Sequence, residues 1–204
     1  MLKSSRIVGL ALLVLLTVPL LASAMVEPDT KREYSDELTV GEGDAQYTLV
    51  GTGVALREKT ILKVDVYVIA SYVCSKAKFE GDENAKAAAL LGLDGNKRLI
   101  MDLTRGFSAE KLKGAFSEVI EKNYDDMSAF QDDMDGFLAY FTKDAEEGDN
   151  LVFDYQPQVG LTTILNGETK GVINNFEFVK ALWTVWFGEK PANGGMKKAL
   201  VANI

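Results

Sequence analysis

Histidine is absent from this 204-residue sequence, and cysteine occurs once, at Cys74. Without histidine the chain cannot build a Ser-His or Cys-His nucleophile, a histidine metal site or the usual general base for neutral pH. A single cysteine excludes an internal disulfide. Its place at the end of an apolar run predicts a buried, inert thiol rather than a nucleophile or an intermolecular bridge.

Metal ligands in a recognisable pattern are also lacking, and we expect neither a metal nor a cofactor. The aspartates at 125, 126, 132, 133 and 135 do not have the spacing of an EF-hand calcium loop. They predict the solvated face of a helix instead.

Positive charge is scarce, since 22 Lys and Arg stand against 30 Asp and Glu and give a net charge of −8. This balance argues against a nucleic-acid partner and against docking on anionic membrane surfaces. It is compatible with an acidic carrier of apolar cargo. Hydrophobic residues make up 47% of the chain, which is enough for one domain with a substantial core.

Long apolar runs are confined to residues 7–21, which follow Lys3 and Arg6 and precede the small residues Ala22-Ser23-Ala24. The run is shorter than the roughly 20 residues of a membrane span. The pattern predicts a signal peptide at 1–24, cleaved after Ala24, and a periplasmic or secreted protein. The mature chain, 25–204, would form a single domain of net charge −10 with no stable membrane span; the sequence leaves its oligomeric state open.

Local patterns predict both strands and helices. Asn166-Gly167 predicts a two-residue hairpin turn, and Gly51-Thr52-Gly53 predicts a strand bulge or turn. Residues 26–36 are polar and predict a loose N-terminal segment. Strands are expected at 37–40, 46–50, 60–74, 98–103, 151–155 and 161–165, and helices at 84–91, 108–123, 127–141, from Asn174 or Asn175 to Gly188, and at 196–201.

The longest predicted strand, 60–74, alternates between two kinds of face. Val68, Ala70 and Tyr72 belong to an apolar face that predicts contact with the core. The opposite face, with Asp65 and Tyr67, is mixed in polarity. Such a face is typical of a strand that is half solvated or lines a cavity containing a few polar groups.

The order of elements from 148 to 191 resembles the bacterial chalcone isomerase-like domain: Gly-Asp before a strand, Asp-Tyr closing it, a hairpin on Asn-Gly, and a helix ending in Phe-Gly-Glu-Lys-Pro. The resemblance continues through 49–73 and 97–120. It implies an α+β fold, an open-faced β-sandwich in which helices cover one side of a large antiparallel sheet. A ligand cleft would lie between the helical layer and the long strand.

The resemblance also implies site residues. The plant enzymes of this superfamily cyclise a chalcone with an arginine near the long strand, a threonine on it and further donors on two helices. The arginine corresponds to Arg57, although Arg98 or Arg105 could take its place, and the threonine to Tyr67. In fatty-acid-binding relatives an arginine and a tyrosine together hold a carboxylate. The alternatives are a surface arginine and a tyrosine at the edge of the core.

Other catalytic positions of the family are altered in this chain. The tyrosine position corresponds to Phe107, the asparagine position to Gly114, and the threonine of the late helix falls near Thr184. Phenylalanine and glycine offer no side-chain hydrogen-bond donor. Losing such donors removes transition-state stabilisation, so the resemblance implies a non-catalytic member of the family.

We therefore predict a protein that binds a small apolar or amphipathic molecule with an anionic head, such as a fatty acid. The predicted ligand-binding residues are Arg57, Tyr67, Tyr72, Phe107 and Thr184. One alternative is an intramolecular lyase that cyclises a chalcone-like enone through Arg57, Tyr67 and Thr184. A donor such as Tyr72, Asn123 or Tyr124 in the cleft would favour it. Another alternative is a ligand-free envelope interaction protein, whose cleft would be filled by Trp183, Trp186 and Phe137 and which would expose an apolar patch.

Overall fold

A seven-stranded antiparallel sheet forms the centre of the fold. The computed structural model describes residues 23–41, 46–59 and 64–204. The strand order is β3-β4-β5-β6-β7-β8-β9, and each neighbouring pair runs antiparallel. The strands are β3 (Glu37–Val40), β4 (Tyr47–Lys59), β5 (Val64–Cys74), β6 (Lys97–Leu103), β7 (Asn150–Gln156), β8 (Gly160–Leu165) and β9 (Glu168–Ile173).

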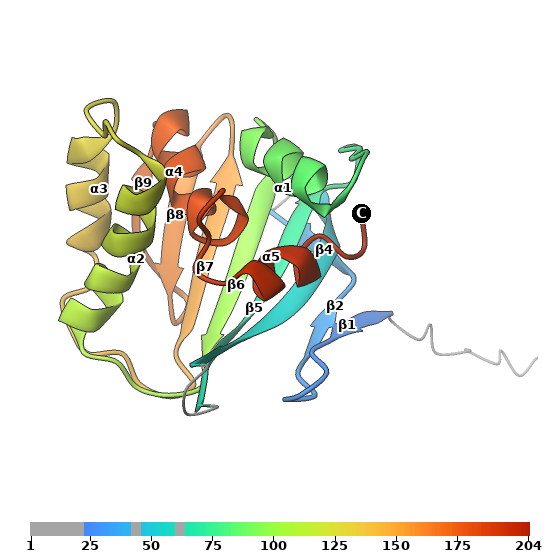
Figure 1. The fold of residues 1–204 in the computed structure, drawn as a ribbon, viewed down its shortest axis with the longest axis horizontal. Coiled ribbons are helices and arrows are strands. Elements are labelled where there is room, and N and C mark those ends of the chain that lie inside the picture. Colours follow the sequence, from blue (N-terminus) through green and yellow to red (C-terminus); the bar gives the residue numbers. More distant parts are fainter. Residues whose placement is uncertain (1–22, 42–45, 60–63) are drawn as a thin grey trace, which may run out of the picture.

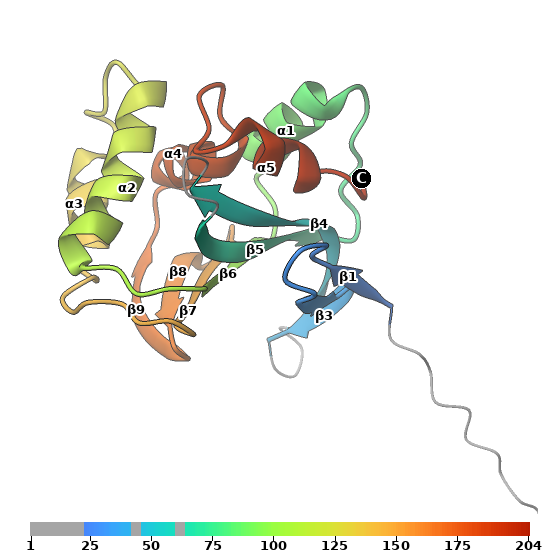
Figure 2. The ribbon, with the colours of Figure 1, turned by 60° about the horizontal axis from the view of Figure 1, so that its bottom comes forward.

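The helices cover one face of this sheet (Figures 1 and 2). They are α1 (Glu83–Gly92), α2 (Ala109–Asn123), α3 (Gln131–Leu138), α4 (Phe176–Phe187) and α5 (Gly194–Ala199). Apolar stripes at helical spacing turn toward the sheet, and in α4 every residue from Phe178 to Phe187 except Lys180 is buried. The predicted α+β class, with helices on one side of an antiparallel sheet, is confirmed.

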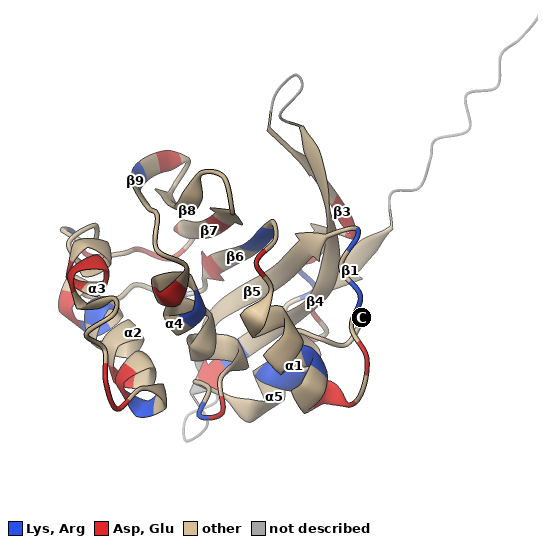
Figure 3. Ribbon diagram, turned by 90° about the horizontal axis from the view of Figure 1, so that it is seen from above, with Lys and Arg blue, Asp and Glu red and all other residues tan. Residues whose placement is uncertain are grey.

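Side-chain caps place the helix starts where the sequence predicts them. Ser108 accepts a hydrogen bond from the backbone N–H of Lys111, and Asn175 accepts one from Glu177. The third helix is shorter than the predicted 127–141: it begins at Gln131, and Phe130 at its N-cap makes no side-chain cap. Asp132 and Asp135 of this helix are exposed, and Figure 3 shows acidic residues in red along α3.

The hairpin prediction at Asn166-Gly167 is confirmed, since these residues join β8 to β9. Both have positive φ, 51° for Asn166 and 79° for Gly167. Asn and Gly tolerate this left-handed region, and two such residues in a row match the right-handed twist of the flanking strands.

The fourth strand runs much further than the predicted strand at 46–50. It continues to Lys59, and Thr52 forms a bulge where the pairing with β5 shifts between Gly51 and Gly53. The Thr52 hydroxyl donates to the carbonyls of Leu200, at 2.8 Å, and Ser71. The predicted bulge is therefore a kink within one long strand. The predicted strand at 60–74 is described from Val64 on, and residues 60–63 lie outside the described residues.

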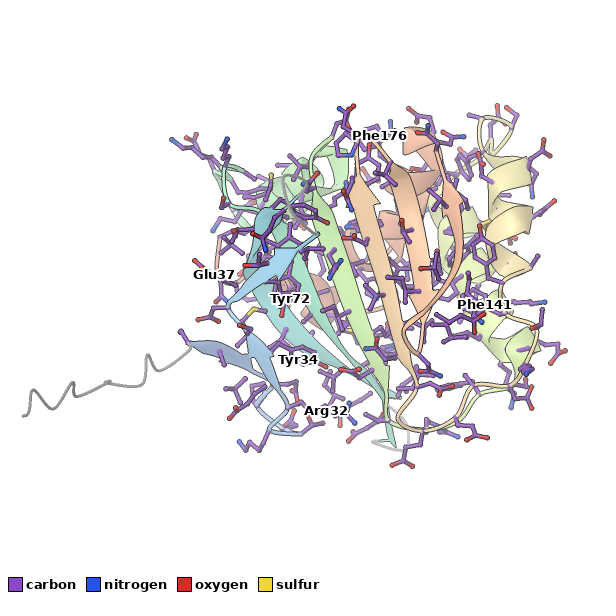
Figure 4. All side chains as sticks on the ribbon, turned by 180° about the vertical axis from the view of Figure 1, so that it is seen from behind. Arg32, Tyr34, Glu37, Tyr72, Phe141 and Phe176 are labelled. Carbon is purple, nitrogen blue, oxygen red and sulfur yellow. The ribbon has the colours of Figure 1, made fainter. Side chains whose placement is uncertain are left out.

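Both faces of β5 are buried from Val68 to Val73, which adds a second core face to the one expected, whereas Tyr67 on the face expected to be mixed is half-buried. Ile69 and Val73 face the helices and the main core, together with Leu99 and Phe153 of neighbouring strands. The alternate positions form a smaller cluster on the other face: Val68, Ala70 and Tyr72 with Leu49, Met25 and Tyr34. Figure 4 looks onto this face and labels Tyr34 and Tyr72.

The N-terminal segment is ordered into a two-stranded hairpin, so the prediction of a loose segment at 26–36 is wrong. The hairpin consists of β1 (Ala24–Val26) and β2 (Glu33–Ser35). Met25 and Tyr34 bury their side chains against the sheet, and the Tyr34 hydroxyl donates to Asp102. The Glu27 carboxylate closes the turn by accepting from the N–H and the hydroxyl of Thr30. The hairpin was missed because only Met25 and Tyr34 anchor it, and two apolar residues in and beside a polar stretch give too weak an alternating pattern to predict strands.

Cys74 ends β5 and is half-buried rather than fully buried as predicted. Its sulfur lies near the backbone of Gly95, at 3.4 Å from the position a Cβ would take there.

Candidate functional site

A cavity of about 420 Å³ lies between the helical layer and the ends of the central strands. Helix α2 forms one wall, the last turn of α4 and the loop after it form another, and β4, β5 and β6 form the floor. Its volume is in the range of small-molecule sites. Most of the lining is apolar: Val66, Met101, Leu103, Phe107, Leu112, Ala115, Phe116, Val119, Val185, Trp186, Pro191 and Ala192.

Arg57 and Tyr67 lie together on the floor of this cavity because they are direct cross-strand partners in β4 and β5. Side chains of such partners start about 5 Å apart on the same face of a sheet. The pairing between the two strands shifts immediately afterwards: Glu58 pairs with Asp65, and Val66 has no pairing partner in β4. Bulges re-aim side chains beside binding sites, and here Val66 lines the cavity as well as Tyr67.

The Arg57 guanidinium keeps most of its hydrogen-bonding capacity. Nη1 donates to the Glu58 carbonyl at 3.0 Å, and no carboxylate within the described ranges forms an ion pair with this side chain. The residue is half-buried. A guanidinium with five N–H groups and one modest partner can receive an anion from the cavity.

The Tyr67 hydroxyl is a neutral hydrogen-bonding group at physiological pH. Burial raises the pKa of Tyr67 to about 12, although the Trp186 hydrogen bond and the Arg57 charge lower it in part. The indole Nε1 of Trp186 donates to the hydroxyl oxygen at 3.1 Å. The cavity floor therefore presents a cation and an uncharged phenol side by side.

Phe107 lines the cavity between β6 and α2. Its backbone exchanges two hydrogen bonds with Ala145, each of 2.8 Å, which hold the crossing segment against the loop before β7. The Arg105 guanidinium lies 5.5 Å from the centre of its ring. The ring gives the site an apolar surface at the position where the family's enzymes are expected to have a tyrosine.

Two of the predicted ligand-binding residues are not in the cavity. Tyr72 points to the opposite face of the sheet, where its hydroxyl donates to the Ser35 carbonyl at 3.0 Å. Thr184 is buried in α4, and its hydroxyl donates to the Ala181 carbonyl of the same helix at 2.6 Å. The structure thus brings together Arg57, Tyr67 and Phe107 and leaves Tyr72 and Thr184 apart from them.

The other candidate donors have partners elsewhere. Asn123 donates to the Val119 and Lys190 carbonyls and accepts from the Lys190 N–H, so it ties α2 to the loop after α4. Tyr124 packs its ring against Phe130, with centroids 5.0 Å apart. Arg98 is on the outer face of the sheet, paired with Asp154 at 2.9 Å. None of these three side chains lines the cavity, and neither does Arg105.

Sequence reasoning named Trp186 only as a side chain that would fill the cleft of a ligand-free protein, and it did not identify the charged rim of the cavity. The rim carries Lys111, Lys122 and Lys190 against a single acid, Glu118, which pairs with Lys122 at 2.5 Å. With Arg57 the lining holds four cations in a chain of net charge −8. The positions 111, 115, 118 and 122 of α2 share one helical face, so the periodicity contained a signal for this wall.

Two further properties bear on the chemistry. In the described part of the chain, no group of three or more His, Cys, Asp or Glu side chains could hold a metal ion. The helices within the described ranges are all too short or too polar to cross a membrane.

Comparisons with known proteins agree with this fold. The family model described as chalcone isomerase-like matches residues 31–202. No curated protein matches the sequence significantly. Among solved structures, the chain is similar to a fatty-acid binding protein of Arabidopsis thaliana, with a TM-score of 0.67 and 17% identity over 89% of this chain and 97% of that chain. The match to the family model over most of the sequence, together with the shared fold, shows that this chain belongs to the chalcone isomerase-like family.

Proposed function

We propose that this protein binds, without transforming it, an apolar molecule with an anionic head, and that the ligand is a fatty acid. The observation that carries the proposal is the pair of Arg57 and Tyr67 at the floor of a cavity whose lining is mostly apolar. The acyl chain would occupy the apolar part, and the carboxylate would meet the guanidinium and the phenol.

Physical chemistry favours this assignment of the two ends. A carboxylate in a cavity loses hydration, and a guanidinium compensates through charge-assisted hydrogen bonds. Tyr67, protonated because its pKa is about 12, adds an uncharged donor. The similar Arabidopsis thaliana structure is described as a fatty-acid binding protein, which supports the same ligand class.

The distribution of donors supports binding rather than cyclisation of a chalcone. An enzyme for that reaction needs hydrogen-bond donors where negative charge develops on the ketone oxygen. Here the corresponding position is Phe107, Gly114 has no side chain, and the Thr184 hydroxyl is engaged within α4. Only Arg57 and Tyr67 remain of the predicted catalytic set at the cavity.

The alternative of a ligand-free interaction protein receives less support. Trp183 and Phe137 are fully buried in the core and do not line the cavity, and Trp186 borders the cavity without filling it. The large apolar side chains that are exposed within the described ranges are Val26, Val159 and Val172, and these lie on different elements or loops.

The test is a binding titration of the purified protein with dodecanoate, by calorimetry. Replacing Arg57 with methionine keeps much of the side-chain volume and removes the charge, and we expect the affinity to fall at least about tenfold. Arg32→Met is the matched control, because Arg32 lies on the N-terminal hairpin, on the other face of the sheet (Figure 4). Native mass spectrometry of the protein from its own source should release a fatty acid from the wild type and little from Arg57→Met.

Two results would overturn the proposal. One is a wild-type protein that binds neither dodecanoate nor any co-purifying lipid. The other is an Arg57→Met variant whose affinity equals that of Arg32→Met.

We further propose that the protein is exported and that residues 1–24 are removed as a signal peptide. Support comes from the positive start, the short apolar run and the Ala22-Ser23-Ala24 sequence. It also comes from Met25, which would be the first residue after cleavage and is buried against the outer face of the sheet.

A further inference from the structure

The hydroxyl of Tyr67 differs from those of the other hydrogen-bonded tyrosines in the direction of its bond. Of the seven tyrosines in the chain, four donate their hydroxyl proton to another part of the protein. These four are Tyr34 to Asp102, Tyr47 to Asp154, Tyr72 to the Ser35 carbonyl and Tyr155 to Asp94. Tyr67 instead accepts, from the indole of Trp186, and donates to no described residue.

The direction of the Trp186–Tyr67 bond is fixed by chemistry. An indole nitrogen is a donor only, whereas a phenol has one proton to donate and two lone pairs that accept. With the indole at 3.1 Å, one lone pair of Tyr67 is occupied and the hydroxyl proton is left for a partner in the cavity. Burial keeps this proton in place, since the pKa of Tyr67 is about 12.

Trp186 is well placed to hold this arrangement. Its side chain is 1% exposed and packs against Phe116 and Phe153, with ring centroids 6.3 and 5.9 Å away. It lies in the last turn of α4, a helix whose core-facing residues are buried. The indole therefore has little freedom to turn away from the hydroxyl.

We propose that Trp186 is a positioning residue that makes Tyr67 a hydrogen-bond donor to the ligand, and so favours an apolar molecule with a strong acceptor-only head, such as a carboxylate, over one with a weaker acceptor, such as a hydroxyl. The inference rests on the proposed function and adds the source of its selectivity. Arg57 also only donates, so the polar floor offers two donors and one remaining phenol lone pair. A carboxylate meets them with two separate, charged oxygens, whereas a hydroxyl head such as that of a fatty alcohol offers a single uncharged oxygen, a weaker acceptor for both groups.

The test compares dodecanoate with dodecanol in wild-type protein and in Trp186→Phe. The quantity measured is the ratio of the two affinities. We expect the wild type to prefer dodecanoate, and Trp186→Phe to reduce the preference about fivefold, the effect of one neutral hydrogen bond. Trp183→Phe is the matched control on the same helix: Trp183 is buried, its Nε1 has no partner among the described residues, and it does not line the cavity. Its ratio should equal that of the wild type.

A double-mutant cycle separates positioning from packing. If Trp186 acts through the Tyr67 hydroxyl, Trp186→Phe should leave the ratio unchanged in a Tyr67→Phe background. A role limited to packing would instead change both affinities by the same factor in either background, and that result would overturn the inference.

An NMR measurement tests the hydrogen bond between Trp186 and Tyr67 without a substitution at Trp186. The indole N–H signal of Trp186 in an NMR spectrum should shift upfield in Tyr67→Phe, because its hydrogen-bond acceptor is lost. An unchanged signal would show that the bond is absent and would end the inference.

The outcomes also separate the two proposals. If the wild type binds neither ligand, the proposed function fails and the selectivity inference fails with it. If the wild type binds dodecanoate and loses affinity in Arg57→Met, while Trp186→Phe keeps the wild-type ratio, only the inference is overturned.

Discussion

Lys97 is a fully buried lysine without a carboxylate partner among the described residues. It points from β6 toward the helices, where Nζ donates to the carbonyls of Leu90 and Leu91 at 3.3 and 3.2 Å. These carbonyls end α1, the negative end of the helix dipole. The rings of Tyr155, Phe176 and Trp183 lie 5.7, 5.4 and 5.2 Å from Nζ. Together these groups stabilise a cation that burial disfavours.

Burial makes Lys97 a source of pH-dependent stability. It lowers the pKa of Lys97 from 10.5 to about 7, with a partial opposing effect of the Asp94 charge. Between about pH 7 and 10.5 the unfolded chain binds a proton at this residue that the folded protein lacks. The free energy of unfolding therefore rises with pH in this window, by at most about 1.4 kcal/mol per pH unit.

The variant Lys97→Met should remove this contribution. We expect urea unfolding of the wild type to give a larger free energy at pH 9 than at pH 7, by about 1–2 kcal/mol more than in the variant. Lys198→Met is a suitable control, because Lys198 is exposed on α5. Equal pH slopes in the wild type and in Lys97→Met would contradict the prediction.

At the scale of single residues, the sequence predicted part of the site. Arg57, Tyr67 and Phe107 were predicted and do line the cavity, since resemblance located the strand and helix start that carry them. Tyr72 did not join them, because residues five apart on a regular strand face opposite sides of the sheet. Trp186 was predicted only as an apolar residue of a helix stripe that could fill the cleft. Its hydrogen bond to Tyr67 depends on how α4 crosses β5, which periodicity does not contain.

At the scale of elements, β4 and the end of α5 approach each other closely at Gly53. A Cβ added there would overlap the Ala199 carbonyl and lie 2.8 Å from Leu200 Cα. The Thr52 hydroxyl and carbonyl bind the same segment, through Leu200 and Asn203. The C-terminal end of α5 thus packs on β4 at a glycine, where no side chain separates the two backbones.

Gly53→Ala should consequently destabilise the protein, because backbone on both sides would have to move. Overpacking of this kind costs about 1–3 kcal/mol, and chemical denaturation measures it. Gly51→Ala is expected to cost less, since its new Cβ would meet the flexible end of Met25, at 2.5 Å from Cε.

Gly114→Ala provides the control for the same substitution in open space. Gly114 is exposed within α2, and nothing lies within 4 Å of an added Cβ. Alanine there should stabilise the helix by about 0.5–1 kcal/mol. A Gly53→Ala variant as stable as the wild type would contradict the close contact between β4 and α5.

Element types were easier to predict than their lengths. The helices at 108–123 and after Asn175 were predicted correctly because capping side chains and wide apolar stripes agree there. Strand β4 was predicted too short, since Gly51 and Gly53 look like the end of a strand. They instead allow a bulge and two close approaches, by Met25 and by α5. Whether such glycines end a strand or allow it to continue depends on tertiary contacts with segments far away in the sequence.

At the scale of the whole molecule, the sheet carries a core on each face. The larger core lies under the helices and leaves the cavity at the strand ends. The smaller one lies under the N-terminal hairpin and contains Leu49, Val68 and Tyr72. The family resemblance predicted the first layer. The second was missed because it depends on two residues, Met25 and Tyr34, that directly follow the predicted signal peptide or lie in a polar stretch.

This arrangement leads to a prediction about processing. If the protein is exported as proposed, the form recovered from outside the cytoplasm should begin at Met25, as N-terminal sequencing can determine. Cleavage after Ala24 removes one exposed residue of β1 and keeps the buried Met25 in place. A protein beginning at Met25 should unfold at nearly the same urea concentration as one beginning at Ser23, because it loses only the exposed Ser23 and Ala24, together with the hydrogen bond from the Asp36 N–H to the Ser23 carbonyl.

A protein beginning at Asp36 should behave differently, because it lacks both Met25 and Tyr34. Losing these side chains would expose Leu49, Val68 and Tyr72 to water and leave Asp102 without the Tyr34 hydroxyl. We expect a loss of about 2–5 kcal/mol in the free energy of unfolding, as for large deletions in a core. Equal stability of the chains starting at Met25 and at Asp36 would show that the hairpin contributes nothing, and a natural N-terminus at residue 1 would contradict export with cleavage. If cleavage follows Ala24 as proposed, Met25 is the first residue kept, and the smaller core under the hairpin loses none of its side chains.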